Sequence, residues 1–257
     1  MILLAGPWVG ELGWELLCWQ GHIRRLSRKF EKTIVIGRPG HGFLYEDFCD
    51  QYIEFDPGSY KTNGWRCEGN KCKLYKTIKH DKYISGQFDI GVFYDGKVFN
   101  DQKGLFKKQE FYKYELNDGS NYPVVIHARN KSTGAVRNWG FKKWEELVFR
   151  LKEAKINVLT IGSPESHSFK GVDDYRGRSL RDVAGVINAC DIIVGPSSGP
   201  MHLASLCGKK HLVWSTNFNR LRYEKAWNPF NTPVIFYDGG GWDPSVKAIF
   251  NLIIETI

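Results

Sequence analysis

The stretch GPSSGPMHLASLCG, residues 195–208, decides how the rest of the chain is interpreted. It follows an apolar β-branched run at residues 192–194 and becomes helical after two prolines and two serines. Pro200 suits the first position of a helix, and Ser197 or Ser198 suits its N-cap. A buried strand that passes through such a bend into a helix is the repeating unit of a parallel sheet. The stretch therefore predicts an α/β fold.

The same bend has the properties of an anion site. Free N–H groups and the helix dipole make a helix N-terminus attractive to phosphate. Gly199 would let a ligand approach the backbone closely. His202 lies in the first turn, where it could donate to a phosphate or ribose oxygen. From spacing alone, an ordinary capped helix with a packed histidine explains these residues equally well.

Apolar β-branched runs alternate with amphipathic stretches along the whole chain, which is typical of mostly parallel α/β proteins. Strands are expected at residues 1–5, 33–36, 89–93, 123–128, 157–161, 191–194 and 210–214. Helices are expected at residues 12–26, 141–151, 180–189, 201–206 and 244–256, the third capped by Ser179 with Asp182 three residues on. The polar segment 117–122 is the expected boundary between two domains, residues 1–120 and 121–257.

Composition is that of a globular protein with a sizeable core. The 257 residues are 42% hydrophobic and 25% charged, which excludes long disorder. No apolar run approaches the roughly 18 residues that a membrane helix needs. The N-terminal segment lacks the basic region of a signal peptide and is expected to form a strand.

Cysteine usage favours a reduced, cytoplasmic setting. Cys18, Cys190 and Cys207 lie in apolar contexts and are expected to be free core residues. Cys67 and Cys72 lie in a polar stretch, where free thiols or a local disulfide are the ordinary interpretations. A zinc site would need tighter paired spacing, so no metal is predicted.

The net charge of +8 suggests an anionic partner. Residues 1–120 hold 18 Lys/Arg against 16 Asp/Glu, whereas residues 121–257 hold 18 against 12. The second half of the chain is therefore where an anion is expected to bind.

A basic loop follows the expected strand at residues 123–128. His127 is followed by Arg129, Lys131 and Arg137. Ligands of parallel α/β sheets bind outside the carboxyl ends of the strands, and arginine matches phosphate geometry. These residues are candidates for diphosphate binding, with a solvated basic loop as the alternative.

The first strand leads into a glycine-rich loop, GPWVGELGWE, residues 6–15. The loop has neither the Gly-x-Gly-x-x-Gly fingerprint nor a Walker lysine. It offers two carboxylates, Glu11 and Glu15, either of which could take a proton from an incoming hydroxyl. Alternatively, Glu11 caps the helix and Glu15 is solvated.

Three stretches together resemble the heptosyltransferase-like (family 9) glycosyltransferases of the GT-B fold. DIIVGPSSGPMHLASLCGKKHLVW, residues 191–214, is similar to the family's strand, Gly-Pro bend and His-Leu-Ala helix. GELGWELLCWQGHIRRL, residues 10–26, is similar to its first loop and helix. VVIHARNKSTGAVRNWGFKKWEELVFRLK, residues 124–152, looks like the opening of its donor domain. The resemblance is strong over residues 123–214, moderate over 1–28 and not visible over 37–120.

The resemblance implies two Rossmann-like domains facing a cleft, with a reduced N-terminal acceptor-side domain and a C-terminal domain that binds a nucleotide-sugar donor. It implies metal-independent, inverting transfer to a hydroxyl of a glycan or lipid-linked saccharide, with no cofactor. Glu11 is the first choice for the base and Glu15 the second, and Gly10, Gly13 and Trp14 lie on the acceptor side. The implied donor-binding residues are His127, Arg129, Lys131, Arg137, Ser197, Ser198, Gly199, Pro200 and His202.

The chain departs from the family pattern at one informative position. Family members usually carry an acidic residue where this chain has Ser197, and that residue is thought to touch the donor sugar. A heptose donor is therefore in question. Segments 219–223 and 227–230 match nothing that we can assign; they are candidates to shape the base or sugar pocket, or an ordinary surface loop.

A basic insert, residues 61–82, keeps other functions open. It holds seven Lys/Arg against two acids, with Trp65 and Tyr75 among them. Such a stretch could follow a nucleic-acid backbone and stack bases, bind an anionic lipid-linked glycan at a membrane surface or a phosphorylated glycan, or simply be solvated. The alternatives are thus a glycosyltransferase acting on a hydroxylated DNA base, and a catalytically silent nucleotide- or nucleic-acid-binding module.

Overall fold

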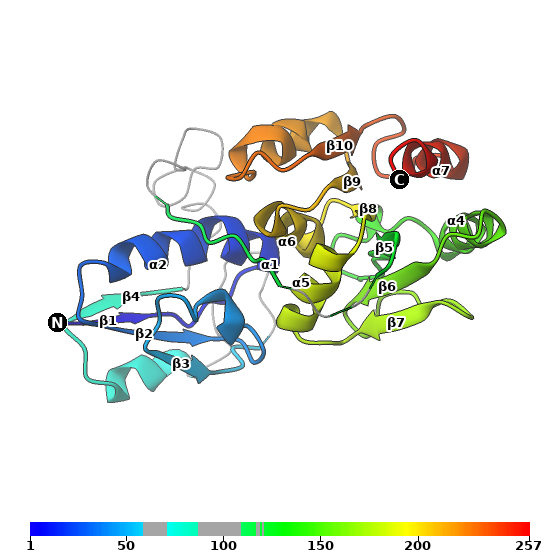
Figure 1. The fold of residues 1–257 in the computed structure, drawn as a ribbon. Coiled ribbons are helices and arrows are strands. Elements are labelled where there is room, and N and C mark those ends of the chain that lie inside the picture. Colours follow the sequence, from blue (N-terminus) through cyan, green and yellow to red (C-terminus); the bar gives the residue numbers. More distant parts are fainter. Residues whose placement is uncertain (59–70, 87–108, 117–118, 120) are drawn as a thin grey trace. The chain divides into compact units, whose positions relative to one another are not determined.

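The chain consists of two compact units, residues 1–112 and 113–257, each built on its own parallel sheet (Figure 1). The computed structural model describes residues 1–58, 71–86, 109–116, 119 and 121–257. The division lies before the polar segment in which we expected the domain boundary. Tyr114 already belongs to the second unit, because its N–H donates to the Leu206 carbonyl at 3.1 Å and its carbonyl accepts from Asn188 at 2.7 Å.

The first unit has a four-stranded sheet in the order β3-β2-β1-β4, with all pairs parallel. The strands are β1 (Ile2–Ala5), β2 (Lys32–Gly37), β3 (Gln51–Glu54) and β4 (Lys82–Ile84). A continuous helical segment connects β1 to β2, and two short 3₁₀ helices flank β3. These helices are α1 (Leu12–Trp14), the π-helix η1 (Glu15–Trp19), α2 (Gln20–Ser27), η2 (Gly42–Leu44) and η3 (Lys71–Thr77).

Gly6 is required where β1 leaves the first sheet. Its φ is +109°, and a Cβ there would lie 2.1 Å from the carbonyl oxygen of Ile36. Only glycine fits this backbone and this approach to β2. The loop that carries the two candidate carboxylates is thereby held against the carboxyl end of the neighbouring strand.

The second unit has a six-stranded parallel sheet in the order β10-β9-β8-β5-β6-β7. The strands are β5 (Val124–Ile126), β6 (Val158–Gly162), β7 (Asp173–Arg176), β8 (Ile192–Pro196), β9 (His211–Trp214) and β10 (Val234–Tyr237). The helices are η5 (Ala135–Arg137), α4 (Phe141–Glu153), α5 (Leu180–Ala189), α6 (Gly199–Cys207), η6 (Asn217–Asn219), the π-helix η7 (Arg222–Ala226) and α7 (Val246–Ile254).

Three tryptophans lie in the core of the second unit. Trp139, Trp144 and Trp214 are fully buried, with ring centroids 4.9 to 5.5 Å apart. The Trp139 indole N–H donates to the Pro244 carbonyl at 2.9 Å. The cluster joins the segment before α4, α4 itself and strand β9 to the start of α7, so the loop after β5 is anchored at its far end.

The structure confirms most of the expected elements of the second unit. Ser179 caps α5 by accepting from the Asp182 N–H at 3.1 Å, as the sequence predicted. Strands β3, β4, β7 and β10 were not expected. The strand expected at residues 89–93 lies outside the described residues.

The cysteine prediction is confirmed for the three core positions. Cys18, Cys190 and Cys207 are buried and free. Cys67 lies outside the described part of the chain. No helix within the described ranges has both the length and the apolar character needed to span a membrane.

Each sheet has one topological switch point, where successive strands stop adding to one side of the sheet and begin adding to the other. In the second sheet, β5, β6 and β7 extend to one side and β8, β9 and β10 to the other, so the switch lies between β5 and β8. In the first sheet it lies between β1 and β4. Loops diverge at such points and leave room for a ligand outside the carboxyl ends of the strands.

Candidate functional site

The switch point of the second sheet brings two predicted stretches together. The His127 N–H, just past β5, donates to the Val194 carbonyl of β8 at 2.9 Å. A Cβ on Gly195 would lie 3.2 Å from the His127 carbonyl oxygen and 3.1 Å from the Met201 sulfur. Glycine at position 195 therefore lets the two strand ends and the first turn of α6 pack closely.

The bend after β8 is a helix N-terminus without a side-chain cap. Helix α6 begins at Gly199, so Pro200 is its second residue rather than its first. Ser198 occupies the N-cap with extended backbone, but its hydroxyl accepts no capping hydrogen bond. The capping role expected of that hydroxyl is wrong: the Ser198 Oγ is buried, with no hydrogen-bond partner in the described structure.

Tyr223 holds this bend; sequence analysis named it only within segment 219–223, as a candidate to shape the base or sugar pocket, and gave it no contact with the bend. Its hydroxyl, from η7, donates to the Ser197 Oγ at 3.1 Å and accepts from the Ser198 N–H at 3.1 Å. Burial is the main reason why its pKa is raised to about 12. The tyrosine therefore stays neutral and keeps both hydrogen bonds across the physiological range.

His202 lies in a cage of aromatic rings behind the bend. Its ring stacks on Tyr223, with centroids 4.3 Å apart, and meets the edge of Trp227 at 4.6 Å. Burial lowers the pKa of His202 well below its usual value, and the charges of Arg222 and Arg137 lower it further. His202 is therefore neutral at pH 7, and its buried Nδ1 has no hydrogen-bond partner among the described residues.

The loop after β5 is folded around Arg129. This buried guanidinium donates to the carbonyl of Gly134 at 3.1 Å, to the Thr133 carbonyl and to the Asn138 side chain. Part of its donor capacity therefore shapes the loop. Lys131 is exposed on the same loop, which ends in η5.

Positive charge gathers at this edge of the sheet. His127 is buried, and burial, together with the charges of Lys131 and Arg129, lowers its pKa to about 4. Arg137 acts in the same direction on His202. The predicted cations and histidines of the donor side are therefore brought together. With the helix N-terminus and two unpaired buried polar atoms, they form a suitable environment for an anion.

The first unit places its two candidate carboxylates differently from each other. Glu11 is partly exposed and occupies the N-cap position of α1, as the capping alternative expected, but its side chain makes no capping hydrogen bond. Glu15 is fully buried, so the solvated alternative is wrong. Its Oε1 accepts from the Tyr45 hydroxyl at 2.8 Å, and its Oε2 lies 2.7 Å from His41 Nδ1.

The other acceptor-side candidates are core residues of the first unit. Gly10, Gly13 and Trp14 are all buried, and Trp14 is 6% exposed. Nor do the described residues contain a group of three or more His, Cys, Asp or Glu side chains that could hold a metal ion.

Comparison with known proteins agrees with the resemblance. Residues 100–213 match the model of glycosyltransferase family 9 (heptosyltransferase). No curated protein sequence matches the chain.

Solved structures of family 9 proteins share the fold over nearly their whole length. A family 9 glycosyl transferase from Veillonella parvula DSM 2008 is 11% identical, with a TM-score of 0.62 over 99% of this chain and 95% of that one. The E. coli ADP-heptose LPS heptosyltransferase II is 14% identical, with a TM-score of 0.61 over 99% and 98%. The E. coli heptosyltransferase WaaC with ADP is 12% identical, with a TM-score of 0.61 over 100% and 99%. The expected GT-B type α/β fold with two parallel sheets is thereby confirmed.

Proposed function

We propose that this chain is a glycosyltransferase that moves a sugar from a nucleoside-diphosphate sugar to a hydroxyl acceptor. The bend between β8 and α6 would hold the donor diphosphate. One observation carries the proposal: Ser198 Oγ and His202 Nδ1 are buried without partners at an uncapped helix N-terminus beside several cations. Unpaired buried polar atoms are rare, and a bound oxyanion would satisfy both.

ADP is the nucleotide that we expect in the donor. Two of the similar solved structures are described by an ADP-heptose substrate or by bound ADP. The sugar is a separate matter, because the position of the family's acidic residue is Ser197 here, and its hydroxyl already accepts from Tyr223. We therefore assign an ADP-sugar without assigning heptose.

The reaction would proceed without a metal. As the bond to the sugar breaks, negative charge develops on the leaving diphosphate, and Lys131, Arg137 and the α6 N-terminus would stabilise it electrostatically. We expect inversion at the anomeric carbon, through direct attack by the acceptor oxygen. Of the two candidate carboxylates of the first loop, Glu15 is not suited to take that proton directly, because both of its oxygens are engaged by neighbours.

A thermal-shift screen tests the proposal. The full chain is heated with ADP, UDP, GDP, CMP and their sugars, each with and without EDTA. A ligand that binds the native state raises the melting temperature, by an amount that grows with its concentration. We expect ADP and an ADP-sugar to give the largest shift, unchanged by EDTA.

A DNA duplex in the same screen tests the remaining alternatives. A shift with DNA, lost at high salt, and no shift with any nucleotide would overturn the proposal in favour of nucleic-acid binding. The structure offers that interpretation little support in the described part of the basic insert. One face of the Tyr75 ring is already stacked on Tyr83, with centroids 4.3 Å apart, while Trp65 lies outside the described residues.

A further inference from the structure

A second polar group lies at the carboxyl edge of the first sheet, built from two loops. Glu15 begins the π-helix that follows β1, and His41 follows β2 just before η2. The Glu15 carboxylate lies 2.7 Å from His41 Nδ1, and the two side chains are 1% and 17% exposed. Single π-helical turns within α-helices are often found at functional sites.

Within the Glu15–His41 pair, the nitrogen that is left to contact a ligand belongs to the imidazole of His41. The other oxygen of Glu15 is used by Tyr45, whereas His41 Nε2 has no hydrogen-bond partner in the described part of the chain. His41 is also the member of the pair with exposed side-chain surface. A carboxylate that holds one imidazole nitrogen fixes the ring's tautomer and leaves the other nitrogen to accept a proton.

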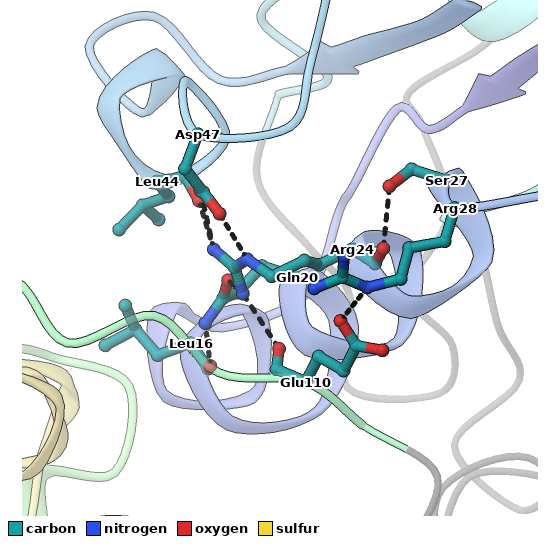
Figure 2. Close-up of polar contacts among 8 residues, drawn as sticks. All are labelled: Leu16, Gln20, Arg24, Ser27, Arg28, Leu44, Asp47 and Glu110. Carbon is teal, nitrogen blue, oxygen red and sulfur yellow. Dashed lines mark hydrogen bonds and ion pairs between the residues drawn. The ribbon is translucent and has the colours of Figure 1, made fainter. Parts of the chain in front are cut away.

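An ion pair between Arg24 and Asp47 connects the segment that carries Glu15 to the segment that carries His41 (Figure 2). Arg24, two turns beyond Glu15 in the same helical segment, pairs with Asp47, with Nε to Oδ2 at 2.7 Å and Nη2 to Oδ1 at 2.9 Å. It also donates to the Leu44 carbonyl at 3.2 Å. The segment that carries His41 and Tyr45 is thereby fixed to the helix that carries Glu15.

The charges around His41 make it easier to protonate than a free histidine. Burial opposes the charge, but the attraction and hydrogen bond of Glu15 outweigh burial, so the pKa of His41 is raised. Arg38, preceding His41 in the same loop, acts in the opposite direction. Other titratable groups lie nearby. The Tyr52 hydroxyl donates to the Arg38 carbonyl at 2.8 Å, Glu54 accepts from the Gly40 N–H at 2.9 Å, and Asp56 lies 3.6 Å from the Arg38 guanidinium.

We propose that His41 Nε2 takes the proton of the acceptor hydroxyl, and that Glu15 is the residue that positions the imidazole. This inference rests on the proposed function and deepens it. The acceptor O–H bond breaks, its proton goes to Nε2, and the oxygen forms the bond to the anomeric carbon. The bond from that carbon to the diphosphate oxygen breaks, and its electron pair leaves with ADP. The imidazolium that forms is stabilised by the buried carboxylate of Glu15.

The pH dependence of nucleoside-diphosphate release is the test, with ADP-heptose and ADP-glucose (which release ADP) and UDP-glucose (which releases UDP) as donors and water as the acceptor. Only neutral His41 can accept a proton, so the wild-type rate should rise with pH through a pKa above 6.5. His41→Gln should lower kcat by about 100-fold or more and remove this inflection. Glu15→Gln should lower kcat and move the inflection to lower pH, because the attraction that raises the pKa is lost.

Two further variants control for folding and for the competing carboxylate. His22→Gln makes the same substitution at another partly buried histidine of the first unit, and it should leave kcat and the inflection unchanged. NMR of ¹⁵N-labelled histidine should show the same shifted titration of His41 in the free protein, and ADP affinity should be unchanged in all variants.

The outcomes separate the two proposals. If His41→Gln turns over as the wild type does while Glu11→Gln abolishes turnover, Glu11 is the base and this inference is overturned. If wild-type protein binds ADP but releases no nucleoside diphosphate from any of the three donors, both this inference and the proposed function are overturned.

Discussion

Ser198 and His202 illustrate what single residues contribute to the proposed donor site. Both sit where a buried strand turns into a helix, and both keep a polar atom unpaired in a buried place. Leaving such an atom unsatisfied costs about 1–3 kcal/mol. Both unsatisfied atoms lie at a helix N-terminus among cations, where a bound oxyanion would supply the missing hydrogen-bond partner and remove this energetic cost.

Tyr223→Phe tests how the bend is held. The substitution removes the two hydrogen bonds to Ser197 and Ser198 while preserving the stack on His202. We expect the free energy of unfolding to fall by about 1–2 kcal/mol, and ADP affinity to fall several-fold. Denaturant unfolding and calorimetric titration measure the two effects.

The control removes a tyrosine hydroxyl elsewhere in the same unit. Tyr122 donates to Asp173 Oδ2 at 2.7 Å, at an exposed place beside strand β7. Tyr122→Phe should leave ADP affinity unchanged. Equal effects of the two substitutions on ADP binding would mean that Tyr223 has no particular role at the bend.

For single residues, the sequence predicted where in the fold a side chain lies better than which side chains it contacts. The strand, bend and helix pattern was enough to place Ser197, Ser198 and His202 together, because backbone geometry brings them there. The contact of Tyr223 with the bend could not be predicted, since it depends on a side chain that returns from a π-helix 25 residues later. Burial of Glu15 was missed because its partners, His41 and Tyr45, come from the next loop.

Arg24 connects a helix of the first unit to two of its loops by hydrogen bonds and an ion pair (Figure 2). Its side chain is 5% exposed and joins α2 to the Asp47 carboxylate, the Leu44 carbonyl and the Glu110 carbonyl, the last at 2.9 Å. Arg24→Leu would leave Asp47 without its partner in a place where that side chain is 20% exposed. We expect the free energy of unfolding to fall by about 3 kcal/mol, measured by chemical denaturation.

Arg28→Leu is the matched control, one turn further along the same helix. Arg28 pairs with the Glu110 side chain but is 69% exposed. Such a surface pair contributes at most about 1 kcal/mol, so the variant should be nearly as stable as the wild type. Comparable losses from the two arginines would contradict the clamp assigned to Arg24.

Elements that were predicted correctly are those buried on a regular pattern. Strands β5 and β8 are apolar throughout, β9 is buried along its whole length, and α4 repeats its apolar residues at helical spacing. Strands β3 and β7, with the sequences QYIE and DDYR, were missed. They lie at the edges of their sheets, where one side is left uncovered and polar residues are tolerated, so no apolar run marks them.

The whole molecule combines two parallel sheets whose switch points each carry polar loops. Alternating apolar runs predicted the parallel α/β architecture, and the motif resemblance predicted the GT-B type. The excess of positive charge in the second half of the chain agrees with the cations gathered beside β5 and β8. Sequence analysis could not supply the contacts that fold the Arg129 loop, because they connect side chains to carbonyls of the loop itself.

The most direct test of the central claim is calorimetric titration of ADP into the wild type, His202→Phe and Ser205→Ala. Phenylalanine keeps the stacking on Tyr223 and Trp227 and removes the imidazole nitrogens. Ser205 is a buried hydroxyl of the same helix that is already paired with His211 at 3.5 Å. We predict that ADP binds the wild type and Ser205→Ala equally, and His202→Phe about tenfold or more weakly, since a hydrogen bond to a charged group is worth about 1.5–3 kcal/mol. Equal affinity for all three proteins, or no binding of ADP to the wild type, would contradict the claim that this bend holds a diphosphate.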